Sequence, residues 1–261
     1  MNETRPLPLW LVICALGLLL LGSATALGML AGPLGVWLGL WSFPTAFSIM
    51  GTIYPFSGWI ALGLGIASLV LLLLARNTYA DRRRGILWLP VVATLACVIA
   101  WYIPGTFQAP AGESYPPIHD VSTDLDDIPR YVAVLPLRID APNSVVYGDS
   151  PNMTPERNAQ LQREAYPDLV PQLYQASEEE MFERALAAVE AMGWELVEAN
   201  PDEGRIEATA TTFWLRFKDD VIIRTRSMGP TTVVDARSLS RVGGGDMGAN
   251  AKRLRKFFEI L

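Results

Sequence analysis

The residues best suited to chemistry gather in one short stretch of this chain, PPIHDVSTDLDD, which runs from Pro116 to Asp127. His119 is the only histidine of the chain, and imidazole and carboxylate groups together could bind a metal ion or exchange protons with a substrate. The alternative is a polar loop in which Asp120 and Ser122 cap local turns and the other aspartates face water. The aspartates of the stretch are Asp120, Asp124, Asp126 and Asp127.

Two metal-binding patterns can be tested against this spacing. An EF-hand loop counted from Asp124 needs glycine at its sixth position, where Pro129 stands, and an acidic residue at its twelfth, where Leu135 stands. A zinc site would have to combine His119 with two carboxylates, because the polar part of the chain has no cysteine. The metal candidates that remain are His119, Asp120 and Asp124.

A second candidate is the polar face of a predicted sheet. Alternation along RIEATAT, residues 205–211, turns small apolar side chains to one face and Glu207 to the other. Cross-strand pairing of arginines with Asp235 would explain the charges on the neighbouring strands. The alternative is a groove in which guanidinium groups bind a carboxylate or an anionic head group. The ligand-binding candidates are Arg224, Arg237, Arg241, His119 and Asp120.

Other motifs indicate structure more readily than catalysis. The glycine-rich SRVGGGDMGAN could hold phosphate at a helix start, but it lacks the P-loop lysine, and Asp246 is expected to cap the helix. Asp219 and Asp220 are predicted to lie in a turn between strands, since acid/base work would need a third partner and a cleft. No G-x-S-x-G motif is present, so we assign no catalytic residue and expect no cofactor.

The number of charged side chains divides the sequence into two parts of different composition. Residues 1–103 carry seven charged side chains and a net charge of +3, whereas residues 104–261 carry 25 acidic and 16 basic ones and a net charge of −9. An acidic domain repels phosphate backbones, so nucleic acid is excluded as a partner. Both cysteines, Cys14 and Cys97, lie in apolar runs.

The first part of the chain predicts a membrane anchor. Three apolar segments approach the roughly 20 residues that a helix needs to cross a bilayer: Leu9–Leu30, Phe56–Ala75 and Ile86–Ile103. The stretch between the first two, residues 31–55, is interrupted by Gly32, Pro33, Pro44 and Pro55, and its residues 34–54 are predicted to form an interfacial or re-entrant helix. No ionisable residue lies within the three spans, which favours a passive anchor over a transporter.

The loop at residues 76–85, RNTYADRRRG, indicates orientation, because short arginine-rich loops stay in the cytoplasm. Three spans then place the amino terminus inside and the carboxy-terminal domain outside, on the periplasmic face of a bacterial inner membrane. A signal peptide cleaved after Ala26 is the alternative for the first span, and it leaves the compartment of the final domain unchanged.

Beyond the anchor, residues 104–118 are predicted to form a proline-rich tether and residues 119–261 a soluble α+β domain. We expect a first strand at 131–139, a short helix from Pro155 that ends before Pro167, and a helix capped by Ser177 and stopped at Gly193. The expected fold is an antiparallel sheet with helices on one face. Further strands are expected at 194–199, 205–217, 221–226 and 232–240, and a last helix at 247–261 with Met247, Leu254, Phe257 and Leu261 on one face.

Four motifs, PPIHDVSTDLDDIP, AYPDL, GRIEATATTFWLRFKDDVIIR and VDARSLSRVGGGDMGANAKRLRKF, occur here in that order. Over about residues 116–261 the chain resembles a bacterial and plastid family known only as a domain of unknown function, the fourteen-ninety-nine family, in its variant with amino-terminal spans. The resemblance implies the domain and no reaction. The chain departs from that pattern at Gly244, Gly245 and Arg216, where many members have a basic residue, a serine and a glycine.

Together these features predict an inner-membrane protein whose periplasmic domain binds a ligand or partner, with an accessory role in the cell envelope. The expected partners are the lipid bilayer and an envelope protein or small anionic ligand. One alternative is a metal-dependent or acid/base enzyme centred on His119 and the nearby aspartates. Another is a scaffold that holds other membrane proteins through the segment from Trp37 to Tyr54.

Overall fold

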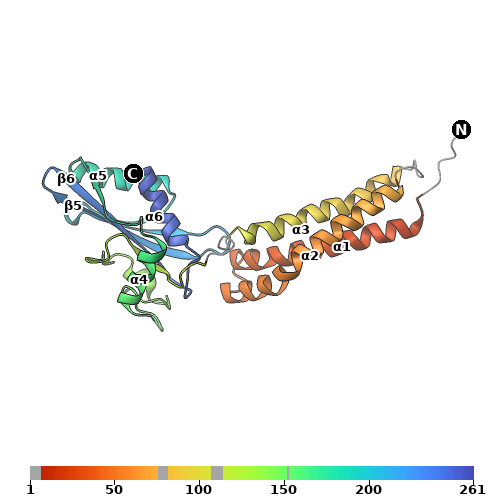
Figure 1. Cartoon of the computed structure of the whole chain (residues 1–261), viewed down its shortest axis with the longest axis horizontal. Helices are drawn as coiled ribbons and strands as arrows, with labels where there is room; N and C mark the ends of the chain where they lie inside the picture. The colour runs from red at the N-terminus through yellow and green to blue at the C-terminus, as the bar shows by residue number, and fades with distance from the viewer. Residues whose placement is uncertain (1–6, 76–81, 107–113, 152) are drawn as a thin grey trace. The chain divides into compact units, whose positions relative to one another are not determined.

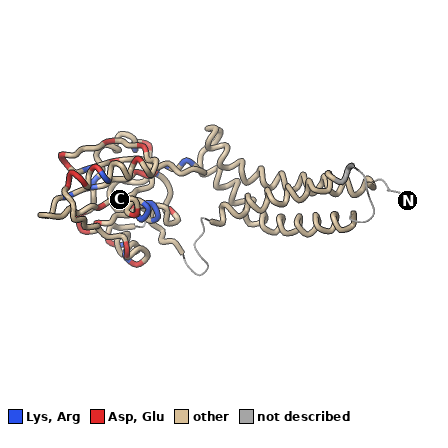
Figure 2. The backbone as a smooth tube through the Cα atoms, turned by 90° about the horizontal axis from the view of Figure 1, so that it is seen from above, with Lys and Arg blue, Asp and Glu red and all other residues tan. Residues whose placement is uncertain are grey.

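The chain folds into two compact units, Met1–Gln108 and Ala109–Leu261, and each has its own buried core. Lys, Arg, Asp and Glu are concentrated in the second unit (Figure 2). The computed structural model describes residues 7–75, 82–106, 114–151 and 153–261. Most of the predicted arginine-rich loop, at 76–81, and the centre of the predicted tether, at 107–113, lie outside the described residues.

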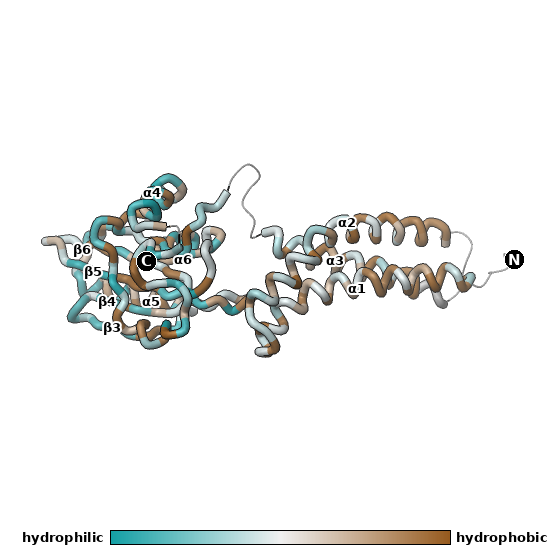
Figure 3. The backbone as a smooth tube through the Cα atoms, turned by 90° about the horizontal axis from the view of Figure 1, so that it is seen from below, coloured by the Kyte–Doolittle hydropathy of each residue, from teal (hydrophilic) through white to brown (hydrophobic). Residues whose placement is uncertain are grey.

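The first unit consists of three long apolar helices, coloured mainly brown in Figure 3. They are α1 (Leu9–Trp37), α2 (Phe43–Ala75) and α3 (Leu89–Gly105), the last preceded by the short η1 (Arg82–Trp88). Within the described residues, three helices are long and apolar enough to cross a membrane, which confirms the three predicted apolar helices.

The segment at 34–54 differs from the prediction of a separate interfacial helix. Its residues extend α1 to Trp37 and begin α2 at Phe43, and both helices continue through an internal proline. The turn between them is closed by Gly39 in a left-handed conformation, with the Leu40 N–H donating to the Gly35 carbonyl at 2.8 Å. A proline removes one helical hydrogen bond, and packing against a neighbouring helix compensates for that loss.

Small residues let the three helices approach one another closely. A Cβ atom at Gly22 would lie 2.8 Å from the Cβ of Ala93, so α1 and α3 pack closely at Gly22 because this residue has no side chain. Cys97 is fully buried, and its thiol donates to the Ser57 carbonyl of α2 at 3.6 Å. These contacts indicate a tightly packed bundle with weakly polar groups at its centre.

The second unit is built on an antiparallel sheet in the order β1-β6-β5-β4-β3, with β2 also paired to β6. Three long strands, β4, β5 and β6, form its centre. The predicted strand at 205–217 ends at Thr211, and residues 212–217 form the loop to β5. The strands are β1 (Asp120–Ser122), β2 (Gln172–Tyr174), β3 (Glu195–Asn200), β4 (Arg205–Thr211), β5 (Lys218–Met228) and β6 (Thr231–Ser240).

Helices α5 (Glu178–Ala191) and α6 (Ala249–Ile260) cover one face of this sheet, as Figure 1 shows. Apolar side chains from alternate strand positions, such as Ile206 and Ile223, pack there against Met181 and Phe257. The predicted α+β fold with helices on one face of an antiparallel sheet is therefore confirmed. Ser177 caps α5 as predicted, but Met247 precedes α6 and is half exposed instead of joining its buried face.

The other face of the sheet lies beneath a long irregular segment, residues 124–148, here called the covering segment. It contains the short helix η2 (Leu135–Arg138) and buries Tyr131 and Val134 against Ile222 of β5. The strand predicted at 131–139 is therefore wrong. The N–H groups of its first residues bind a side chain of the sheet instead of a neighbouring strand, and Pro136 has no N–H to donate.

Helix α4 (Pro155–Ala165) protects the edge of β1. The Gln162 side chain accepts a hydrogen bond from the Ser122 N–H and donates to the Ser122 carbonyl, as a neighbouring strand would. Asn158 donates to the Asp120 carbonyl at 3.0 Å. These amide groups satisfy an edge that would otherwise be open to pairing with another chain.

Two glycines with left-handed backbones allow a matched test of this fold. A Cβ atom at Gly204 would lie 2.2 Å from the Thr225 carbonyl oxygen, whereas one at Gly193 would have no neighbour within 4 Å. Gly193→Ala should cost only the backbone penalty of about 1–2 kcal/mol. Gly204→Ala adds a steric clash between the β3–β4 turn and the backbone of β5, and we expect it to lower the free energy of unfolding by at least about 3 kcal/mol.

Urea unfolding of the second unit, measured by pulse proteolysis of the full chain in detergent micelles, checks this prediction. Equal losses for the two variants would contradict the packing of Thr225 over Gly204.

Candidate functional site

The charged side chains on the covered face of the sheet form a buried ionic layer. They include Glu207 of β4, Asp220 of β5, and Asp235 and Arg237 of β6, all of them buried. Alternation along the strands placed Glu207, Asp235 and Arg237 on the face away from the helices, as predicted, and Asp220 of β5 lies on the same face. The covering segment shields most of that face from water, so each buried charge there requires a partner.

Asp120 and Arg237 form the most deeply buried pair. The Arg237 guanidinium donates to both carboxylate oxygens of Asp120, at 2.9 and 2.8 Å, and the Arg237 side chain is only 2% exposed. Its other N–H groups donate to the carbonyls of Pro129 and Val145, and its plane lies over the ring of Tyr131. Four donor contacts leave Arg237 without room for an external anion.

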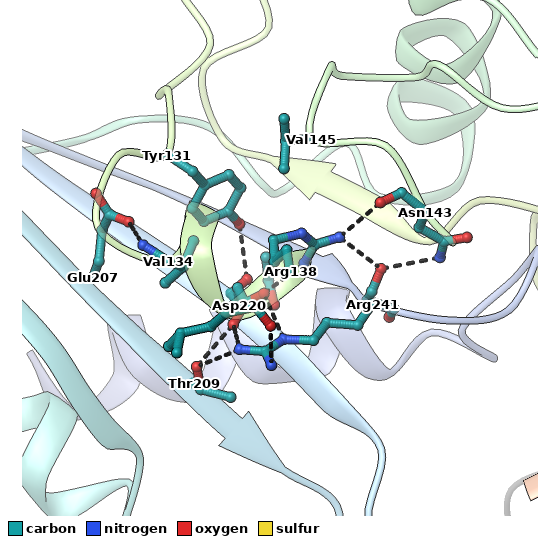
Figure 4. Close-up of polar contacts among 12 residues, drawn as sticks. Tyr131, Val134, Arg138, Asn143, Val145, Glu207, Thr209, Asp220 and Arg241 are labelled. Atoms are coloured by element: carbon teal, nitrogen blue, oxygen red, sulfur yellow. Dashed lines mark hydrogen bonds and ion pairs between the residues drawn. The ribbon is translucent and has the colours of Figure 1, made fainter. Parts of the chain in front are cut away.

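A second cluster surrounds Asp220 (Figure 4). Arg138 of the covering segment and Arg241, just after β6, both donate to its carboxylate, and so does the hydroxyl of Thr209. Arg241 also donates to the Leu137 carbonyl at 2.9 Å. The cluster therefore holds the covering segment onto three strands of the sheet.

Glu207 also holds the covering segment on the sheet, and it does so through backbone hydrogen bonds. Its carboxylate accepts hydrogen bonds from the backbone N–H groups of Val132, Ala133 and Val134, at 2.9, 3.1 and 2.9 Å. It also pairs with Arg205, a neighbour on the same strand. A carboxylate that accepts three backbone hydrogen bonds is an effective anchor for an irregular segment.

The edge of the layer reaches solvent. Arg224 and Arg226 lie between Asp235, which is fully buried, and Asp124 and Asp127 of the covering segment. Burial alone would raise the pKa of Asp124. The backbone N–H groups of Asp127 and Asp126 and the Arg226 guanidinium outweigh burial, so that the pKa falls below its ordinary value. Asp124 is therefore an anion at neutral pH.

His119 does not take part in this network. Its side chain is buried, and the hydrogen bonds at this residue are made by its backbone carbonyl, which accepts from Ser240 and Asn250. Asp120 is committed to Arg237, and Asp124 to Arg226 and the turn that follows it. Within the described residues, no group of three His, Cys, Asp or Glu side chains is placed to hold a metal ion.

The two remaining sequence motifs also have structural partners. Asp219 and Asp220 lie in β5 and not in the predicted turn, because the chain turns earlier, at 212–217, and Asp219 pairs with Arg253 of α6. In the glycine-rich segment, the carboxylate of Asp246 accepts hydrogen bonds from the N–H groups of Gly248 and Asn250. This occupies the start of α6 where a phosphate would bind, in agreement with the expected cap.

One surface groove stands apart from these closed contacts. It has a volume of about 280 Å³ and lies between residues 123–126, the end of α4 at Gln162 and Arg163, and the turn from Tyr166 to Pro171. Its rim carries Asp126, whose side chain is 99% exposed and lies 3.9 Å from Arg163. The groove is an open candidate site on the second unit.

Sequence reasoning identified several charges of the layer and missed both the layer and the groove. Arg237, Arg241 and Arg224 were candidates for binding a ligand or for pairing across strands, and in the structure each contacts a carboxylate of the chain itself. The roles of Arg138 and Glu207 were missed. The sequence signal that could have revealed the role of Glu207 is its position between the apolar residues Ile206 and Ala208 of a central strand, because a glutamate buried there requires a partner.

Two arginines of the layer allow a direct comparison. Arg237→Ala leaves the buried carboxylate of Asp120 without its partner, and we expect a loss of about 3–5 kcal/mol in the free energy of unfolding. Arg224→Ala leaves Asp235 paired with Arg226, and we expect a loss of about 1 kcal/mol. Denaturant titration of the two full-length variants measures both values. An Arg237→Ala protein as stable as the wild type would show that Arg237 is not a structural residue.

Comparison with curated proteins finds no match to this chain. Residues 135–261, which include η2, all of α4, β2 to β6 and both helices on the sheet, match the family described as Protein of unknown function (DUF1499). The match begins after His119 and after the first part of the covering segment. It confirms the resemblance seen in the sequence motifs. Over residues 135–261, the second unit of this chain is therefore similar to the DUF1499 family.

Proposed function

We propose that this protein is a membrane-anchored binding module, in which the three apolar helices hold a domain that recognises a partner without catalysing a reaction. The observation that carries the proposal is the contrast between the two kinds of polar surface on the second unit. The arginines and carboxylates of the buried layer are committed to one another, whereas the groove beside α4 is open. Acid/base chemistry needs a titratable group that faces a cleft, and the carboxylates buried in the layer face none.

The lining of the groove favours a partner with basic and apolar side chains. Asp126 brings an exposed carboxylate to one wall, opposite Arg163, while Asp124 is paired with Arg226. Leu169 and Val170 bring apolar surface to the other wall. The volume is near the lower end for a small-molecule pocket, so an extended segment of a protein fits it better than a drug-sized ligand. The acidic balance of the domain would assist the approach of a basic partner.

Compartment and orientation are part of the same proposal. The arginine-rich loop at 76–85 supports a cytoplasmic position for the connection between the second and third spans. The amino terminus is then cytoplasmic, and the binding domain faces the periplasm of a bacterial inner membrane. Its partner would be an envelope protein, and its role accessory to the envelope.

A reporter enzyme that is active only after export, fused after Leu261, tests the orientation. The proposal predicts full activity of this fusion, and low activity when the same reporter follows Arg84. The reverse pattern would place the domain in the cytoplasm and contradict the proposed compartment.

A photo-crosslinking amino acid tests the groove in living cells. Val170 lies on the groove wall and is 49% exposed, while Leu196 is 47% exposed on β3, at the opposite edge of the sheet. Crosslinker at 170 should give one discrete adduct with an envelope protein, and crosslinker at 196 should not. An adduct that forms equally at both positions, or at neither, would argue against recognition through the groove.

A further inference from the structure

The loop between β4 and β5 has a composition that is unusual for an exposed turn. Its sequence is TFWLRF, residues 212–217, here called the aromatic loop. Phe213 is 66% exposed, and its ring stands edge-on to the ring of Trp214 with 5.3 Å between centroids. Turns in water are normally built from Gly, Pro, Asn, Asp and Ser, so large aromatic groups here indicate a surface that meets something apolar.

Hydrogen bonds within the loop hold these rings in place. The Thr212 N–H donates to the Phe217 carbonyl at 2.8 Å, and the Phe217 N–H donates to the Thr212 hydroxyl at 2.9 Å. Arg216 adopts a left-handed backbone with φ of 55°, which turns the chain back into β5. These contacts give the loop a defined backbone conformation, with Phe213 exposed on its surface.

The aromatic loop lies at the end of the sheet where the chain from α3 joins the second unit. It follows the last residue of β4, and the first residues of β5 pair with the last residues of β6. The end of β6 also contacts the start of β1, because the Ser240 N–H donates to the His119 carbonyl. The opposite end of the sheet carries the β5–β6 turn at Gly229 and Pro230.

A bilayer is always within reach of this end of the domain. The chain from Gly105, where α3 ends, to Ser114 can extend over at most about 30 Å. A surface tethered at so short a distance has a high effective concentration, so even a modest affinity produces contact. The bilayer that holds α3 is therefore a permanent neighbour of the second unit.

Charge near the loop fits a lipid surface. Arg216 and Lys218 are exposed and lie beside the aromatic residues in the sequence, and Asp219 and Asp220, which follow them, are buried in contact with arginines. Elsewhere the domain is acidic, so an anionic membrane would repel most of its other surfaces. Aromatic rings beside basic groups are typical of segments that lie at the boundary between head groups and acyl chains.

We propose that the aromatic loop inserts into the head-group interface of the bilayer that anchors the chain. Phe213 and Trp214 enter the interface, and Arg216 and Lys218 contact lipid phosphates. The insertion gives the domain a second attachment besides its tether, and it turns the β5–β6 turn away from the membrane. The proposal does not depend on which face of the membrane carries the domain or on what binds in the groove.

Lipid quenching of a site-specific fluorophore tests this insertion in the full chain. Cys14 and Cys97 are replaced by alanine, and a single cysteine is introduced by Phe213→Cys for labelling with an environment-sensitive dye. Met228→Cys is the matched control, because Met228 is 63% exposed and lies at the opposite end of the sheet. The proteins are reconstituted into vesicles of phosphatidylethanolamine and phosphatidylglycerol, with nitroxide-labelled lipid in both leaflets.

The proposal predicts a blue-shifted emission at position 213, and quenching by nitroxides near the head group that is several-fold stronger than at position 228. Equal quenching at the two positions would overturn it. A blue shift at 213 without lipid quenching would also overturn it, because the loop would then be covered by protein, such as a second copy of this chain.

Discussion

The second unit depends on the pairing of charges that its own fold removes from water. A buried carboxylate or guanidinium without a partner costs several kcal/mol, so the face of the sheet that carries Glu207, Asp220 and Arg237 is stable only when each of them is matched. The partners come from distant parts of the chain. Arg138 reaches Asp220 across 82 residues, and Asp120 reaches Arg237 across 117. The covering segment is ordered by these contacts, since it has little regular structure of its own.

Local patterns in the sequence predicted the elements that depend on local interactions. The apolar helices, the cap of α5 at Ser177 and its stop at Gly193 follow from composition, capping and periodicity within a few residues. The central strands follow from alternation, and the cross-strand contact of Arg224 with Asp235 was one of the two interpretations considered.

The predictions that failed are those decided by distant partners. Residues 131–139 have the composition of a strand, but the carboxylate of Glu207, more than 70 residues away, binds the backbone N–H groups that a strand would use. Alternation also predicted a polar face without revealing that a second layer covers it. For the same reason alternation left open whether the arginines of that face pair across strands or bind a ligand, and it did not predict the groove formed by 123–126 and the turn after α4.

The buried ionic layer matters for the proposed function because its paired charges make the covering segment rigid. Charges that bind one another hold the covering segment in one position, and with it the wall of the groove at Asp124. A rigid wall suits recognition, because little conformational entropy is lost when a partner binds. The layer is thus the support of the proposed binding surface.

Hydrogen exchange at the amides of Val132, Ala133 and Val134 tests this account most directly. These N–H groups bind the buried carboxylate of Glu207, so they should exchange only when the second unit opens. In the full chain held in micelles, we expect protection similar to that of the central residues of β5. Exchange as fast as that of an exposed loop would show that the covering segment is not held on the sheet, and would contradict the account.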